Sequence, residues 1–147
     1  MLPGESQHGK LAGTLESAHT MDATANLALL AGRICLAGLF IYDASVMARS
    51  WEQTAAYMTD YGLPTLLLPF AALFQFVGGV FLVLGHWTRL TALAFAGFAA
   101  MTALIFHFPD GNTIQFGKDI AIAGGFLVLA AAGGGRWSAD AYREGRG

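Results

Sequence analysis

Long apolar segments alternate with short polar ones along the chain. A helix rises 1.5 Å per residue, so about 20 apolar residues cross the hydrocarbon core of a bilayer, which is about 30 Å thick. Four segments come close to that length, at residues 26–47, 64–84, 89–107 and 118–134. Because lipid cannot hydrogen-bond the backbone, segments of this length must be helices. The pattern therefore predicts an all-α integral membrane protein with four transmembrane helices.

The links between these segments are short. The second segment opens with "GLP" at 62–64, "GHWT" at 85–88 is a tight connection, and "PDGN" at 109–112 is a strong turn signal. Links of this length join consecutive antiparallel helices. We therefore expect an antiparallel four-helix bundle over residues 25–137.

Polar residues outside the apolar segments predict two tails and an orientation. Residues 1–24 have mixed charges and lack the apolar run of a signal peptide, so we expect a loose tail there, and residues 138–147 form a second polar tail. Lysine and arginine favour the side that holds both termini, which the positive-inside rule places in the cytoplasm. That side has Lys10, Arg89, Arg136, Arg143 and Arg146, against Arg49 and Lys118 on the other.

Composition agrees with a membrane protein and excludes several functions. Of 147 residues, 55% are hydrophobic and 12% are charged, whereas about 25% are charged in soluble domains. The net charge of −2 gives no basic face for a nucleic acid. A single cysteine, Cys35, excludes an intramolecular disulfide and a cysteine metal site. We find no intrinsic haem, flavin or metal motif.

Glycines inside the apolar segments are interpreted as sites of close helix contact. A helical glycine costs about 1 kcal/mol relative to alanine in a soluble helix. In membranes, small residues let helix backbones approach. The alternative is a glycine-lined cofactor cleft. The glycines concerned are Gly78, Gly79, Gly97, Gly124 and Gly125.

Polar groups within the spans are the candidates for function, because an ionisable residue at the bilayer centre costs at least about 2.5 to 3.5 kcal/mol. His107, Asp43 and Lys118 are the catalytic candidates, and we expect them to converge with Asp119 near the ends of their helices. Asp43 and Lys118 are the first pair we draw, because a buried carboxylate without a cation would protonate. Asp119 could instead cap the fourth helix.

Two further polar residues leave alternatives open. Gln75, in the middle of the second segment, could bond another helix or, with His107 and Lys118, contact a quinone. Arg33 could reach the membrane surface along its aliphatic stem or serve a function. Charged residues at helix ends could also do no more than terminate the spans.

The chain resembles the DoxX family of small four-helix membrane proteins from about residue 26 to residue 142. The resemblance rests on "RICLAGLFIY", "YGLP", "FQFVGGVFLVLGHWTRLTAL", "FHFPDG" and "GKDIAIAGGFLVLAAAGGGRWSADA". Family members commonly have glycine, lysine and glutamate where this chain has Ala44, Met47 and Gln75. The resemblance implies a multi-pass protein of a bacterial or archaeal-type inner (plasma) membrane.

The resemblance leaves two functions open. Some relatives are membrane subunits of thiosulfate:quinone oxidoreductases, which implies a quinone-linked redox subunit with quinone as cofactor. The alternative is a non-catalytic accessory subunit that anchors and stabilises a larger complex. Other membrane subunits or further copies of the chain are the expected partners, besides the lipid bilayer. A small transporter ranks last, since four helices leave little room for a hydrophilic path.

Overall fold

The computed structural model describes the backbone of residues 5–109 and 111–145, and side chains from Ala23 onward. The tail expected over residues 1–24 was predicted to be loose, but its backbone is helical from Glu5 onward and continues into the first span. Its cytoplasmic location stays a prediction. The described residues form helices and no strand. The elements are α1 (Glu5–Arg49), α2 (Trp51–Asp60), α3 (Leu67–Leu84), α4 (Thr88–Thr102), the π-helix η1 (Ala103–His107), α5 (Thr113–Ala132) and α6 (Ala139–Arg143).

Four stretches of these helices are long and apolar enough to cross a membrane, which confirms the expected fold class. They are Ala23–Arg49, Leu67–Leu84, Thr88–His107 and Thr113–Ala132. The largest difference from the predicted bounds is at the fourth span, which we expected to begin at residue 118. It begins at Thr113 because the Asn112 side chain accepts a hydrogen bond from the Gln115 amide at 3.2 Å and caps the helix there.

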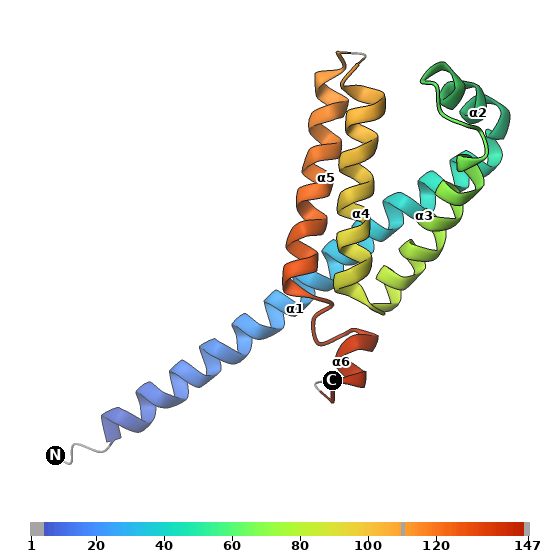
Figure 1. Cartoon of the computed structure of the whole chain (residues 1–147). Helices are drawn as coiled ribbons and strands as arrows, with labels where there is room; N and C mark the ends of the chain where they lie inside the picture. The colour runs from blue at the N-terminus through green and yellow to red at the C-terminus, as the bar shows by residue number, and fades with distance from the viewer. Residues whose placement is uncertain (1–4, 110, 146–147) are drawn as a thin grey trace.

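The spans form two antiparallel hairpins, with α1 packed on α3 and α4 packed on α5. Figure 1 shows the α1/α3 hairpin inclined across the α4/α5 hairpin. Aromatic rings fill the crossing, where Phe40 of α1 lies 4.5 Å from Phe95 of α4 and 5.3 Å from Phe126 of α5, centroid to centroid. Contact between α3 and α4 is sparser than within either hairpin. The bundle is therefore joined mainly through this aromatic centre.

Among the glycines that we interpreted as sites of close helix contact, only the two on α3 lie too close to another helix to carry a Cβ. A Cβ at Gly78 would lie 2.7 Å from the Phe95 ring, and one at Gly79 would lie 2.6 Å from Ile41. Gly97 and Gly124 have nothing within 4 Å of such a Cβ. The interpretation as packing sites was therefore wrong for these two within the described chain, because they lie on helix faces that point away from the other helices.

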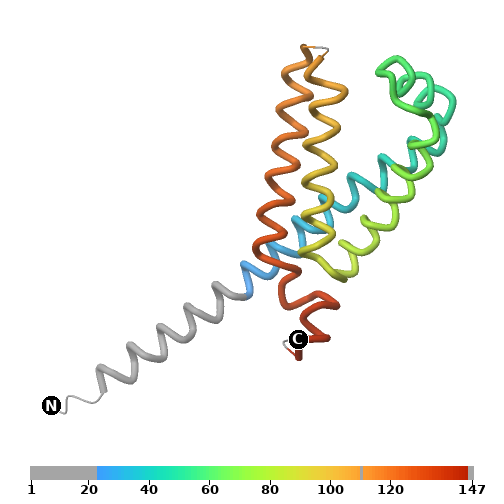
Figure 2. Tube along the Cα trace, in the orientation of Figure 1, coloured from blue at the N-terminus to red at the C-terminus, as the bar shows by residue number. Residues whose placement is uncertain are grey.

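The two ends of the spans differ in what covers them. Helix α2 and the beginning of α5 lie at one end, which we call the α2 end, opposite to the C-terminus (Figure 2). The link at 85–88 lies at the other end, together with the loop after α5 and α6. We call residues 133–145 the C-terminal segment. We expected a polar tail from residue 138, but the segment folds back on α1 and α4 through hydrogen bonds described below.

Candidate functional site

A histidine and a carboxylate form a close pair at the α2 end. His107, the last residue of η1, places Nδ1 2.7 Å from Oδ2 of Asp119 on α5, and the two side chains are 22% and 14% exposed. Gln115 Nε2 lies 3.5 Å from the other carboxylate oxygen of Asp119. A neutral imidazole that donates from Nδ1 keeps Nε2 as an acceptor, and a protonated one donates from both nitrogens. Nε2 bonds no described residue of the chain.

The period of α5 explains why Asp119 rather than Lys118 joins this pair. Consecutive helical residues differ by about 100° in direction. Asp119 lies four residues after Gln115 on the same face, whereas Lys118 is exposed and forms no hydrogen bond or ion pair with the described residues. The expected Asp43–Lys118 pair was therefore wrong. Asp119 does not cap α5 either, because the helix begins at Thr113.

Two further polar residues extend from the pair toward the middle of the spans. Gln75 is fully buried on α3, and its Nε2 lies 3.5 Å from the Met47 sulfur, while its Oε1 has no hydrogen-bond partner among the described residues. Asp43 of α1 lies within electrostatic range of both Gln75 and Asp119. His107, Asp119, Asp43 and Gln75 therefore form one group, which we call the α2-end cluster.

Aromatic side chains of α2 and of Tyr61, the residue that ends it, lie beside the α2-end cluster. The Tyr57 ring stacks on Phe106 at 5.4 Å, and Tyr61 meets Phe106 edge-on at 5.1 Å. Phe106 directly precedes His107 within the π-helix. Such single π-turns occur often at functional sites. The turn directs Phe106 toward α2 and His107 toward α5. Neither α2 nor the π-helix was foreseen, because α2 is short and weakly apolar on average and the π-helix continues an apolar run without a signal of its own.

Arg33 belongs to a different site, at the C-terminal end. It is 1% exposed, and its guanidinium donates to the Gly134 carbonyl at 2.7 Å and to the Trp137 carbonyl at 2.8 Å. The side chain therefore extends to the loop that follows the fourth span, which ends at Ala132. It holds the loop after α5 against α1. Free carbonyls in a glycine-rich loop leave no charge or hydropathy signal, so the sequence could not identify them as its partners.

Asp140 of α6 caps α4 from outside that helix. Its two carboxylate oxygens accept hydrogen bonds from the backbone of Trp87 at 2.9 Å and Thr88 at 2.8 Å. Burial acts to raise the pKa of Asp140, but these hydrogen bonds and nearby His86 outweigh burial, so the pKa of Asp140 lies below its ordinary value. The group is therefore a carboxylate at neutral pH and stabilises the positive end of α4.

Metal chemistry has no support in the geometry of the described side chains. Among them, no three His, Cys, Asp or Glu residues lie close enough together to hold a metal ion. The His107–Asp119 pair supplies only two adjacent groups of this kind. A titratable ring held by a carboxylate, as in this pair, is suited to proton exchange and hydrogen bonding.

Comparison with known proteins gives one family and two curated relatives. The sequence model of the DoxX family matches residues 28–108, which include Asp43, Gln75 and His107. The chain is 38% identical over 123 residues to inner membrane protein YqjF of Escherichia coli, covering 82% of this chain and 95% of that one. It is 33% identical over 122 residues to inner membrane protein YphA of the same organism, covering 76% and 87%. No solved structure gives a significant match.

Proposed function

The chain belongs to the DoxX family of membrane proteins, and from this we propose that it is the membrane subunit of a quinone-linked redox complex. The His107–Asp119 pair is the observation that carries the proposal. It combines a titratable ring with a fixed carboxylate at the end of apolar spans. In the proposed orientation both termini are cytoplasmic, so this pair lies near the opposite face of an inner (plasma) membrane.

Quinone reduction takes up two electrons and two protons, and the residues of this chain can supply the protons and the orientation. His107 Nε2 would donate a hydrogen bond to one quinone carbonyl, and the protonated ring would serve as the proton donor at that atom. Asp119 holds Nδ1 and stabilises the protonated ring before the transfer. The electrons would come from a partner subunit or a bound cofactor, because the sequence carries no redox-active cysteine pair and no flavin or haem motif.

Gln75 is suited to hold the second carbonyl. Its Nε2 donates to the Met47 sulfur at 3.5 Å, and because sulfur is a weak acceptor this bond is readily exchanged for a stronger one. Asp43 lies near both Gln75 and Asp119 and can return protons to the pair. Lys118, a quinone contact expected from the sequence, is exposed and away from this group, so it is left out of the proposed site.

Quinone binding tests the proposal directly. The purified chain in detergent is titrated with a short-chain benzoquinone and, separately, a short-chain naphthoquinone, and quinone retained from the native membrane is quantified by mass spectrometry. Loss of a charge-assisted hydrogen bond weakens binding by roughly tenfold or more. We expect that loss for His107→Ala and Asp119→Asn and no change for Lys118→Gln, the matched control. Thermal unfolding of each variant checks that the fold persists.

An accessory role is the competing function, and the open surface of the helices favours it. Phe70, Leu73 and Phe76 of α3 are 63%, 60% and 52% exposed, so this face needs lipid, another subunit or a second copy of the chain as a neighbour. Protein partners in fixed ratio without any bound quinone, together with equal quinone titrations for wild type and His107→Ala, would overturn the redox proposal in favour of this one.

A further inference from the structure

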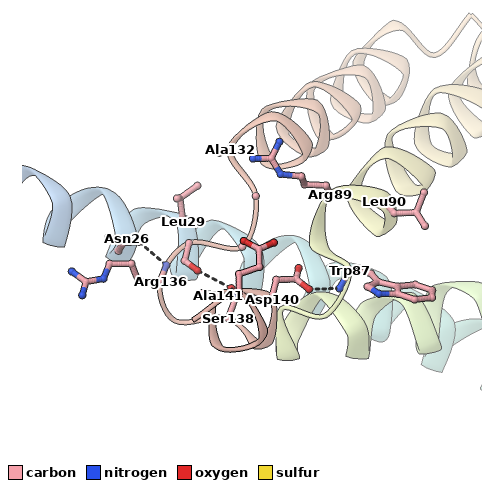
Figure 3. Close-up of a pocket in the computed structure, with 14 residues that line it drawn as sticks. Asn26, Leu29, Trp87, Arg89, Leu90, Ala132, Arg136, Ser138, Asp140 and Ala141 are labelled. Carbon is pink, nitrogen blue, oxygen red and sulfur yellow. Dashed lines mark hydrogen bonds between the residues drawn. The ribbon is translucent and has the colours of Figure 1, made fainter. Parts of the chain in front are cut away.

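Hydrogen bonds fix the C-terminal segment against the ends of the spans. The Arg136 amide donates to Asn26 Oδ1 of α1 at 2.8 Å, and the Asp140 carboxylate accepts from the Trp87 amide at 2.9 Å, directly before α4. Figure 3 shows both contacts. The fourth span ends at Ala132, one residue before the segment. The segment is therefore held at the level where the spans leave the bilayer.

An open groove of about 710 Å³ lies between this segment, α1 and the end of α3. The two helices contribute Leu30, Val83 and Leu84, and the C-terminal segment contributes Trp137 and Tyr142. Leu84, Trp137 and Tyr142 are 59%, 55% and 85% exposed. Exposed apolar surface that gathers in one place marks a contact with a membrane or with another protein.

The side chains that the segment brings to the groove suit the boundary between acyl chains and headgroups. Trp137 and Tyr142 each join an apolar ring to one polar atom, and neither the indole N–H nor the hydroxyl bonds another described residue. Rings of this kind concentrate at the membrane interface, where the ring contacts acyl chains and the polar atom stays hydrated. Arg143, exposed in the same groove, adds an aliphatic stem with a charged end, which suits the same depth.

The surroundings of the groove favour lipid over a partner protein. Phe76 and Val83 of α3 lie seven residues apart, about two turns, so they share one face, and they are 52% and 40% exposed. The groove therefore continues an exposed apolar face of a span. Trp87, 54% exposed, lines a separate cleft at the beginning of α4. A partner would cover one side of the chain, whereas lipid surrounds it and contacts both clefts.

We infer that the C-terminal segment lies in the headgroup region of the bilayer, and that upper acyl chains of the lipid fill the groove between Leu84, Trp137 and Tyr142. The segment is then part of the membrane-embedded surface, although its sequence resembles a polar tail. The inference does not depend on the proposed redox function, since the groove shares no residue with the α2-end cluster.

Fluorescence of a single tryptophan tests the inference. The full chain with Trp51→Phe and Trp87→Phe, two exposed positions, keeps Trp137 as its one tryptophan. It is placed in phosphatidylcholine vesicles whose acyl chains are brominated either near the ester groups or near the chain ends, and the shallow bromines should quench Trp137 more strongly. Since Trp137 is 55% exposed, its iodide quenching constant in water would be roughly half that of N-acetyltryptophanamide, and at the interface we expect roughly a fifth or less.

Two further chains with one tryptophan each serve as controls. The first keeps Trp87 and should show the same shallow quenching. The second lacks the native tryptophans and carries Leu73→Trp, near the middle of α3, and the deep bromines should quench it best. Iodide quenching of Trp137 without quenching by brominated lipid would overturn the inference, because the segment would then lie in water. Protection of Trp137 from both quenchers would also overturn it, in favour of a protein or a second copy of the chain over the groove.

Discussion

Replacement of Arg33 by methionine should detach the C-terminal segment while the spans stay folded. The guanidinium makes two hydrogen bonds, at 2.7 Å to the Gly134 carbonyl and at 2.8 Å to the Trp137 carbonyl. A hydrogen bond to a charged group contributes about 1.5 to 3 kcal/mol, so the pair contributes roughly 3 to 6 kcal/mol. Methionine fills similar space and needs no desolvation of a charge, which offsets part of the loss. We therefore expect a net cost of about 3 kcal/mol.

That cost applies to local opening, since the hydrogen bonds concerned hold a loop rather than the centre of the bundle. A change of about 3 kcal/mol raises the population of the open segment by roughly a hundredfold. Hydrogen–deuterium exchange of the Asp140 amide reports this, because that amide donates to the Gly85 carbonyl at 3.0 Å in the closed segment. Exchange across residues 134–145 should accelerate by the same factor, with α4 and α5 unchanged.

Two variants control this experiment. Arg49→Met removes an arginine at the other end of α1, and exchange in residues 134–145 should stay within twofold of wild type. Arg33→Lys keeps the charge but loses the forked geometry, so it should fall between wild type and Arg33→Met. Equal exchange in Arg33→Met and Arg49→Met would refute the assignment of Arg33 as the group that holds the loop.

Three further predictions concern glycine packing, pH and α2. Gly78→Ala should lower the melting temperature in detergent, because its Cβ would meet the Phe95 ring at 2.7 Å. Overpacking of this kind costs about 1 to 3 kcal/mol. Gly97→Ala is the control and should not lower the melting temperature, because nothing lies within 4 Å of its Cβ. Folding lowers the pKa of Asp140, so its carboxylate stabilises the folded C-terminal segment at neutral pH. This contribution to the free energy of folding is lost as the pH falls below about 4. Tryptophan fluorescence should show this transition in wild type, and Asp140→Asn should lack it. Tyr57→Ala should remove about 1 kcal/mol of ring contact with Phe106 and speed proteolysis at α2 without moving the melting temperature by more than a few degrees.

The four spans could be predicted because membrane length and backbone hydrogen bonding impose a strong pattern on the sequence. Their termini were less predictable. Asn112 begins α5 earlier than the run of apolar residues suggests, since a cap depends on one side chain and not on mean hydropathy. Helix α2 was missed because ten residues of low mean hydropathy resemble a loop when only long apolar runs are sought.

The candidate residues were found more readily than their partners. Polar residues within apolar spans are conspicuous, so His107, Asp43 and Gln75 could be identified from the sequence. Pairing depends on helix rotation, and a difference of one residue on α5 decides between Lys118 and Asp119. A contact such as that of Arg33 with Gly134 joins residues 101 positions apart and involves only a carbonyl on one side. No periodicity in the sequence reports such a contact.

The Arg33 contact also sets an order for biogenesis. Arg33 enters the bilayer with the first span, but the carbonyl it binds belongs to Gly134, which is translated 101 residues later. At a synthesis rate of about 5 to 20 residues per second, that interval lasts roughly 5 to 20 seconds. During this time the guanidinium in the first span lacks its native acceptors, which lie in the loop after the fourth span. The nascent chain therefore needs water, lipid phosphate or an insertion factor beside its first helix until its last residues leave the ribosome.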